Sequence, residues 1–319
     1  MHTILLVEKI HPKYMTLLER RARVVRPEGF DEAALARVVA DEQVDAIIIR
    51  TKGCVSERIL RASAKLKVVG RHGIGVDHID LAAAARAGVI VVNTPGGSRI
   101  AVAEHTWGMI LALAKNSVRA DAAVRAGDYE LRERLKSYQL AGKTLGVIGL
   151  GRIGSTVAET AVRGFGMNVL YTDIVARPKL ERWLRARRVP LRQILSRSDV
   201  VTIHTPLDRS TRGLIGARQL GWMRPHALLI NCARGAIVDT VAVAAALNAG
   251  ELGGAGIDVF DPEIPPRDHP LLKCANAIFS PHSAAQTLEA NLGYAEVVDD
   301  VLGVLAGRKP RFPVTAIEQ

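Results

Sequence analysis

A glycine-rich segment in the middle of the chain has the spacing of a nucleotide-binding turn. Residues 146–154 read GVIGLGRIG, so an apolar run leads straight into Gly149, Gly151 and Gly154 in the pattern G-x-G-x-x-G. In such a turn the first glycine allows a tight bend, the second lets the backbone approach a pyrophosphate, and the third lets a helix pack on the strand. The phosphates then lie at a helix N-terminus, where free N–H groups favour negative charge.

An acidic residue at a suitable distance favours a dinucleotide cofactor. The segment NVLYTD ends at Asp173, 19 residues after Gly154, where a carboxylate accepts hydrogen bonds from the adenosine ribose hydroxyls. A helix cap or a loop acid is the alternative for Asp173 alone, but the combined pattern favours the dinucleotide. Because a carboxylate repels a 2′-phosphate, we expect NAD rather than NADP, although Arg177 and its neighbours could accept such a phosphate.

Polar residues follow several later apolar runs, in the segments IHTPL, NCARG, GIDVFDPE and SPHSAAQT. Each could be a routine connection between a strand and a helix. Dinucleotide enzymes place their chemistry at the C-terminal ends of strands, and these segments together supply a base, an acid and a cation there.

Short apolar runs alternate with amphipathic or alanine-rich stretches along most of the chain, which predicts parallel sheets covered by helices. A long helix over 100–114 is expected to join two such blocks, and a helical tail over 284–307 is expected to return to the first block. A further helix is predicted over 31–42, where acidic residues suit a helix N-terminus. Strands are predicted over 3–7, 45–50, 67–71 and 89–92 in the first block, and over 144–149, 168–173, 200–206, 227–233, 254–260 and 277–282 in the second.

The composition places the chain among globular proteins of the cytoplasm. Its 319 residues suffice for two domains, and 48% hydrophobic with 24% charged residues is ordinary for a soluble protein. No apolar stretch reaches about 18 residues and the N-terminus lacks a signal-peptide pattern, so no membrane association is expected. Three widely spaced cysteines fit a reducing compartment, and no pair has metal-ligand spacing, so no metal is expected.

The net charge of +11 raises the question of nucleic-acid binding. The arginines are scattered, aromatic residues make up only 4%, and no basic–aromatic alternation occurs. The densest basic segment, 177–197, is interpreted as a solvated helix face rather than a polyanion site. We therefore expect no nucleic-acid partner.

Six motifs occur in order along essentially the whole chain: LKVVGRHGIGVDHIDL, VVNTPGGSRIAVAEHT, GKTLGVIGLGRIG, NCARGAIVD, AGIDVFDPE and SPHSAAQT. In these motifs the chain resembles the D-isomer-specific 2-hydroxyacid dehydrogenase family, which includes D-3-phosphoglycerate, glyoxylate/hydroxypyruvate and D-lactate dehydrogenases. The resemblance implies an α/β fold of two domains. A Rossmann-type doubly wound parallel sheet, residues 99–285, is inserted in a smaller flavodoxin-like α/β substrate domain, residues 1–98 plus 286–319.

The resemblance also implies three catalytic roles. His282 corresponds to the histidine that exchanges a proton with the substrate hydroxyl while hydride moves between C2 and the nicotinamide, a task suited to an imidazole. Glu263 would pair with His282 and stabilise its imidazolium form. Arg234 would hold the substrate carboxylate and carbonyl oxygen, orienting C2 and polarising the C=O bond.

Substrate contacts are implied in the first block. The loop at Gly73, Ile74 and Gly75 matches the family loop whose backbone N–H groups bind the substrate carboxylate, with Ile74 also near the cofactor. His72 stands where many phosphoglycerate enzymes carry Ala and is expected to line the substrate pocket. Arg50 belongs to a basic cluster that either meets a phosphate or second carboxylate or is simply a solvated strand end.

Further cofactor contacts are implied in the second block. Asp258 is expected to face the nicotinamide carboxamide, and Arg152 and Ile153 the pyrophosphate. The residues expected to line the cofactor cleft are Thr205, Pro206, Cys232 and Ala233, with Cys232 acting as a small wall residue rather than a nucleophile.

The resemblance thus implies a cytoplasmic NAD-dependent oxidoreductase that interconverts a small 2-oxo acid and its D-2-hydroxy acid. The expected pair is 3-phosphoglycerate and phosphohydroxypyruvate, or the glyoxylate and hydroxypyruvate substrates. Family members usually form homodimers through the nucleotide domain, and the sequence reads as the short form without a regulatory domain. The alternatives are a non-catalytic NAD(H)-sensing regulatory protein and, from the charge alone, a polyanion-binding protein.

Overall fold

The computed structural model describes residues 1–314 of the chain, and the last five residues of the predicted substrate domain, 315–319, lie outside the described residues. Its contacts divide the chain into two compact units. Unit 1 consists of Met1–Ser98 with Gln286–Gln319, and unit 2 of Arg99–Ala285. Each unit is an α/β layer structure and is described by itself.

Unit 1 is built on a parallel sheet of five strands in the order β2-β1-β3-β4-β5. The strands are β1 (His2–Leu6), β2 (Ala22–Val25), β3 (Ala46–Ile49), β4 (Val68–Arg71) and β5 (Ile90–Val92). This order is that of flavodoxin-like folds and confirms the fold expected for this part of the chain. Strand β3, with the sequence AIII, is buried throughout, as expected for a parallel strand covered on both faces.

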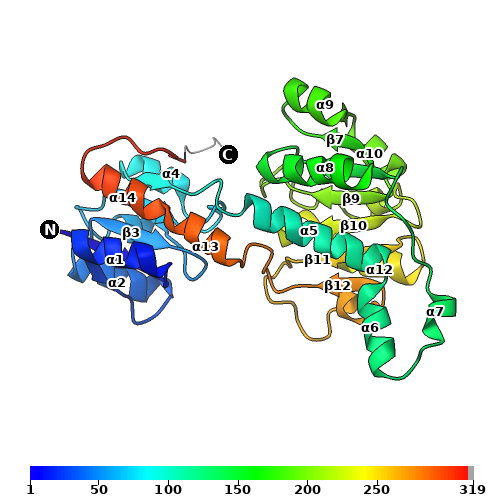
Figure 1. Cartoon of the computed structure of the whole chain (residues 1–319). Helices are drawn as coiled ribbons and strands as arrows, with labels where there is room; N and C mark the ends of the chain where they lie inside the picture. The colour runs from blue at the N-terminus through cyan, green and yellow to red at the C-terminus, as the bar shows by residue number, and fades with distance from the viewer. Residues whose placement is uncertain (315–319) are drawn as a thin grey trace. The chain divides into compact units, whose positions relative to one another are not determined.

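Helices cover both faces of this sheet (Figure 1). One face packs against α2 (Glu32–Asp41), α3 (Glu57–Leu60) and α4 (Leu81–Arg86), and the other against α1 (Pro12–Arg21) and α14 (Val297–Leu305). Helix α13 (Leu288–Ala295) leads into α14, whose Val297 and Val301 are fully buried with Ile48 and Val68. The C-terminal segment therefore completes the core of the N-terminal block.

Unit 2 is built on a parallel sheet of seven strands in the order β12-β11-β10-β9-β6-β7-β8. The strands are β6 (Thr144–Ile148), β7 (Asn168–Thr172), β8 (Arg187–Arg188), β9 (Val200–Ile203), β10 (Leu228–Asn231), β11 (Gly254–Ile257) and β12 (Ala277–Phe279). The chain runs from β6 to β7 on one side and then returns to β9 on the other. The sheet is therefore doubly wound, with its topological switch point at the end of β6.

Two hydrophobic clusters lie on the two faces of the second sheet (Figure 1). One contains residues of α5 (Arg99–Ala114) and α8 (Arg152–Phe165), and the other residues of α10 (Leu191–Arg197), α11 (Ala217–Leu220) and α12 (Thr240–Asn248). The remaining helices are α6 (Ser117–Arg125), α7 (Leu131–Arg134) and α9 (Pro178–Leu184), with 3₁₀ turns at Gly235–Ile237 and Pro270–Lys273.

Two strands were missed in the sequence. Strand β2 follows α1 without a loop and has only four residues, so no turn residue marks its start. Strand β8 consists of two exposed arginines inside the basic segment 177–197. That segment is therefore not one solvated helix face, as expected, but the succession α9, β8 and α10. Among the described residues, no helix combines the length and apolarity needed to cross a bilayer.

Candidate active site

The glycine turn lies at the switch point of the unit 2 sheet, directly after β6. Gly149 has a φ of +93°, a conformation that favours glycine. A Cβ on Gly154 would collide with the carbonyl oxygen of Gly149, so only glycine lets α8 begin this close to the turn. Both glycines thus serve the approach of helix α8 to strand β6.

Gly151 leaves the start of α8 open to a ligand. It is the N-cap of this 14-residue helix, and no side chain caps the first N–H groups. A Cβ on Gly151 would meet no atom within 4 Å, so the backbone faces free space. Arg152 is exposed on the first turn, while Ile153 packs against the core. These features fit the pyrophosphate of a dinucleotide.

Asp173 ties the end of β7 to the glycine turn. Its carboxylate accepts hydrogen bonds from the backbone N–H groups of Leu150 at 2.9 Å and Val175 at 3.0 Å. The guanidinium of Arg188 donates to the carbonyl oxygen of Asp173 at 2.7 Å. The carboxylate is therefore held at the sheet edge where a ribose would lie, with a cation close to its backbone.

The loops after β9 and β10 carry the other residues expected in the cofactor cleft. The hydroxyl oxygen of Thr205 is buried without a hydrogen-bond partner among the described residues, and Pro206 beside it is exposed. An orphaned hydroxyl next to the glycine turn fits a cofactor group that would complete it. Burial raises the pKa of the Cys232 thiol to about 12, so it is protonated at neutral pH. Ala233 follows it as a half-buried residue.

The candidate catalytic residues follow three adjacent strands. Arg234 lies after β10, Glu263 after β11 and His282 after β12, and these strands are neighbours in the sheet. The Nδ1 atom of His282 lies 2.5 Å from Oε1 of Glu263. Both side chains are accessible to solvent, at 43% and 59%. The structure thus brings the base and the acid into contact and places the arginine on the next strand.

The Arg234 turn is held by a buried amide. The side chain of Asn231, which is fully buried, donates to the carbonyl oxygen of Arg234 at 2.9 Å and accepts from the N–H of Ala233 at 3.0 Å. The guanidinium of Arg234 also donates to the carbonyl oxygen of Ala233 at 2.7 Å. Asn231 was not singled out from the sequence, although it begins the NCARG motif.

Asp258 is buried at the end of β11 and organises the His282 turn. Its carboxylate accepts hydrogen bonds from the N–H groups of Ser283 at 2.8 Å and Ala284 at 3.1 Å. Its carbonyl oxygen accepts from the N–H of His282 at 2.7 Å. The residue expected to face the nicotinamide therefore also anchors the turn with the candidate base.

In unit 1 the loop after β4 presents backbone N–H groups. The carbonyl oxygen of Ile74 accepts from the side chain of Asn93, and that of Gly75 from the side chain of Arg71. Gly73, with a φ of +141°, donates to the hydroxyl of Thr94. Within the described residues, the N–H groups of Ile74 and Gly75 donate to no protein acceptor. An anion would satisfy them.

Arg50 and His72 also lie at this edge of the unit 1 sheet. The carboxylate of Glu8 accepts from the N–H groups of Arg50 at 3.2 Å, Thr51 at 2.5 Å and Lys52 at 2.9 Å, which fixes the loop after β3. The guanidinium of Arg50 donates to the side chain of Gln286 at 2.7 Å. Glu8 was not identified from the sequence, but its position directly after β1, at the switch point of this sheet, was a usable signal.

His72 is buried, with 2% of its surface accessible. Neither ring nitrogen has a hydrogen-bond partner among the described residues, and the ring lies 5.5 Å from that of Tyr294. Burial lowers the pKa of His72 to about 4, with the charge of Arg50 adding to the effect. The imidazole is therefore neutral at pH 7.

The glycine turn, the aspartate after β7 and the polar strand ends together define a dinucleotide-binding α/β protein with a histidine–carboxylate pair. Comparison with known proteins gives the family. Residues 107–284 match the family described as "D-isomer specific 2-hydroxyacid dehydrogenase, NAD binding domain". The chain belongs to this family, and unit 2 carries its NAD-binding domain.

Individual relatives agree with this assignment. The chain is 38% identical over 306 residues to a D-3-phosphoglycerate dehydrogenase of Methanocaldococcus jannaschii, covering 95% of this chain and 57% of that relative. It is 38% identical over 262 residues to a glyoxylate reductase of Thermococcus litoralis, covering 80% of this chain and 78% of the relative. A solved D-lactate dehydrogenase from Aquifex aeolicus, complexed with NAD and lactic acid, matches with a TM-score of 0.87 at 29% identity, covering 96% of each chain.

Proposed function

We propose that the protein is an NAD(H)-dependent dehydrogenase that interconverts a small 2-oxo acid and its D-2-hydroxy acid. The observation that carries the proposal is the placement of Arg234, Glu263 and His282 after three neighbouring strands, with the His282–Glu263 pair in contact. This arrangement offers a cation, a base and an orienting carboxylate at the edge of the sheet that also carries the glycine turn. Dinucleotide enzymes of this architecture react at that edge.

The histidine–carboxylate contact determines which nitrogen does the chemistry. Glu263 lies at Nδ1 of His282, so the carboxylate accepts the Nδ1 proton and leaves Nε2 as the atom that exchanges a proton with the substrate. When His282 takes the hydroxyl proton of the 2-hydroxy acid, the negative charge of Glu263 stabilises the imidazolium. When bound, NAD supplies the hydride acceptor, and NADH the donor in the reverse direction.

Two positively polarised groups are proposed to bind the substrate. The guanidinium of Arg234 would hold the carboxylate and the C2 oxygen, because its planar donors match two oxygens at once. The N–H groups of Ile74 and Gly75 in unit 1 would bind the same class of anion, since no protein acceptor uses them within residues 1–314. Each of these groups would favour a 2-oxo carboxylate over a neutral carbonyl compound.

The substrate pair is proposed to be 3-phosphoglycerate and phosphohydroxypyruvate, or glyoxylate and hydroxypyruvate. The relatives named above include both activities. Arg50 and Lys52, on a loop fixed by Glu8, offer cations for a distal anionic group. His72, proposed to line the pocket, contributes a neutral ring with unpartnered nitrogens among the described residues. In this proposal the cations would favour a substrate with a phosphate or a second carboxylate.

The two units are proposed to divide the work, with unit 1 as the substrate domain and unit 2 as the NAD-binding domain. The glycine turn, Asp173 and the orphaned Thr205 hydroxyl in unit 2 support this division. Three free cysteines among the described residues fit a reducing compartment, so we propose that the protein acts in the cytoplasm.

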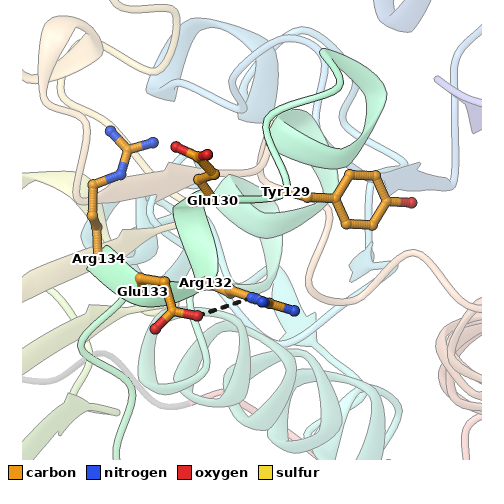
Figure 2. Close-up of a pocket in the computed structure, with 5 residues that line it drawn as sticks. All are labelled: Tyr129, Glu130, Arg132, Glu133 and Arg134. Atoms are coloured by element: carbon orange, nitrogen blue, oxygen red, sulfur yellow. Dashed lines mark hydrogen bonds and ion pairs between the residues drawn. The ribbon is translucent and has the colours of Figure 1, made fainter.

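A homodimer through unit 2 is also proposed. Helices α6 and α7 contain no buried residue, and Val118, Val124 and Tyr129 on this segment are exposed. A hollow of about 450 Å³ lies beside α7. Among the residues that line it, Tyr129 points away from the Arg132–Glu133 ion pair (Figure 2). A segment of two helices without a fully buried residue is suited to pack against a second copy. Sedimentation of the wild type and of Val124→Asp tests this proposal, since the charge should shift a dimer to a monomer.

The test of the reaction is an NADH-oxidation panel with glyoxylate, hydroxypyruvate, pyruvate, phenylpyruvate and 3-phosphohydroxypyruvate. His282→Ala should lower turnover by at least a hundredfold while leaving NADH affinity nearly unchanged, since the side chain acts on the substrate proton. A control is His2→Ala, because the His2 side chain is 41% accessible, belongs to unit 1 and pairs only with the part-buried Asp45, at 3.1 Å, in the described residues. Tight NADH binding without turnover of any 2-oxo acid would instead identify a sensor.

A further inference from the structure

A chain of three polar side chains runs from helix α5 to the turn that carries His282. The Nε2 atom of His105, on α5, lies 2.8 Å from the hydroxyl oxygen of Ser280. The Ser280 hydroxyl lies 2.5 Å from Oδ1 of Asp258, and His105 Nε2 lies 3.7 Å from the same oxygen. All three residues belong to unit 2, so the chain of contacts is internal to one compact body.

The donor and acceptor roles in this chain follow from the chemistry of its members. An ionised carboxylate only accepts, so the single proton of the Ser280 hydroxyl must point to Asp258. The hydroxyl oxygen can then only accept from His105, which requires a proton on Nε2. The direction of donation is therefore His105 to Ser280 to Asp258, and it is the same for neutral and protonated His105.

Asp258 connects this chain of contacts to the backbone turn of the candidate base, His282. The same Oδ1 that accepts from Ser280 also accepts from the N–H of Ser283, while Oδ2 accepts from the N–H of Ala284. These two N–H groups follow His282, whose φ is +51°, a left-handed conformation that a residue with a side chain rarely adopts. A rotated Asp258 carboxylate would release both N–H groups and with them the His282 backbone.

We propose that His105 and Ser280 form a relay that holds the Asp258 carboxylate in the orientation needed by the His282 turn. His105 is then a positioning residue for the acid–base histidine, although 175 residues separate it from Ser280. The inference rests on the proposed function for the role of His282, but the relay itself is a property of the fold. Its test therefore needs one readout that depends on turnover and one that does not.

The first readout is the steady-state kinetics of four variants with the best substrate of the panel. Ser280→Ala and His105→Leu should each lower kcat roughly tenfold, the effect of one lost orienting hydrogen bond. The double variant should lose no more than the worse single variant, because both act through the same carboxylate. Ser280→Thr keeps the hydroxyl and should restore most of the lost turnover, and NADH affinity should change less than twofold in all four.

The second readout is hydrogen exchange at the N–H groups of Ser283 and Ala284. In Ser280→Ala and His105→Leu their exchange should accelerate roughly tenfold or more, since the carboxylate that holds them is less constrained. A matched control is Thr240→Val, which removes the 3.0 Å hydroxyl contact of Thr240 with His269, a similar pair elsewhere in unit 2. In that variant kcat and both exchange rates should equal those of the wild type.

The outcomes separate the relay from the proposed function. Unchanged exchange at both N–H groups in both single variants overturns the relay, and so does a double variant whose losses in kcat multiply. If the wild type reduces no 2-oxo acid, the proposed function fails while the exchange data still decide on the relay. If His105→Leu does not fold, the pair Ser280→Ala and Ser280→Thr decides, because only the first removes the hydroxyl.

Discussion

The replacement His72→Phe should change how the stability of unit 1 depends on pH. His72 is buried against Tyr294, with both ring nitrogens unpartnered among the described residues. Phenylalanine keeps an aromatic ring in contact with Tyr294 and removes the group that would have to accept a proton. The perturbation therefore isolates one titration inside the core.

The sign and the size follow from the pKa of His72, which burial lowers from 6.5 to about 4. Between these values the unfolded chain takes up a proton that the folded chain refuses, so stability falls as the pH is lowered. The contribution is fully present above pH 6.5 and lost by about pH 4. A difference of about 2.5 in pKa corresponds to a loss of about 3 kcal/mol over this interval. Burial also lowers the pKa of His204, to about 3, but His204 is common to both proteins and cancels in the comparison.

Hydrogen exchange of the buried amides in β3 and β4, measured at pH 7, 5.5 and 4.5, reports the free energy of opening of unit 1 alone. This matters because two units can unfold separately and need not share one transition. The wild type should lose about 2 kcal/mol relative to His72→Phe between pH 7 and pH 4.5, because the loss is not yet complete at the lower pH. At pH 7 the variant should be at least as stable, since it no longer buries two unpartnered nitrogens. Parallel curves for the two proteins would show that His72 is not buried as a neutral ring and would refute the reasoning.

Three further substitutions test other parts of the structure. Asp173→Ala should lower the ratio of kcat/KM for NAD over NADP by roughly tenfold to a hundredfold, because a charged hydrogen-bond acceptor at the ribose is lost. An unchanged ratio would contradict the ribose role of Asp173. Gly154→Ala should destabilise unit 2 by about 1–3 kcal/mol, because the added methyl group collides with the carbonyl oxygen of Gly149. It should also weaken NADH binding in a fluorescence titration, and an unchanged affinity would mean that α8 can shift without cost. Burial raises the pKa of Asp199, but hydrogen bonds from the Thr144 N–H and from His226 outweigh this effect and lower the pKa overall. The ionised carboxylate therefore stabilises the fold at a pH above its unfolded pKa, and this stabilisation is lost as the pH falls. Asp199→Asn should therefore cost about 2 kcal/mol in urea unfolding at pH 7 and much less near pH 3, and a loss independent of pH would contradict this sign.

The parts of the fold that the sequence predicts are those with a strong local pattern. Runs of apolar residues mark most of the strands, because a parallel strand buried on both faces needs no polar alternation. Strand β8 escaped prediction because its two arginines pair only through the backbone at a sheet edge. The glycine turn was recognisable because backbone conformation and close packing restrict it to one residue type.

The site residues that the sequence predicts are likewise those in a strong local motif. Arg234, Glu263 and His282 lie in short motifs at strand ends, so their residue types and their order along the chain indicate their location. His105 lies in one of the motifs on the mostly apolar helix α5, but nothing in the sequence pairs it with Ser280, and only the folded structure brings the two side chains together. A single sequence does not show which residues far apart in the chain come into contact.

The turn that carries His282 shows why such contacts matter. The left-handed backbone at His282 costs about 1–2 kcal/mol, and an ion pair as exposed as that with Glu263 contributes at most about 1 kcal/mol. The pair therefore cannot hold the turn. Hydrogen bonds to a charged group contribute about 1.5–3 kcal/mol each, and Asp258 accepts two from the backbone that follows His282.

The neighbouring strand uses the same device. Asn231 at the end of β10 is fully buried. Its side chain donates to the carbonyl oxygen of Arg234 and accepts from the N–H of Ala233, which fixes the backbone on both sides of the Ala233–Arg234 peptide. In both turns the side chain proposed to react remains accessible, while a buried polar residue at the strand end fixes the backbone below it. Replacing Asp258 or Asn231 should therefore impair turnover by displacing His282 or Arg234, with both reacting side chains still present. A geometry set by buried hydrogen bonds keeps the reacting groups accessible to substrate and still holds them in place, which an exposed ion pair could not do.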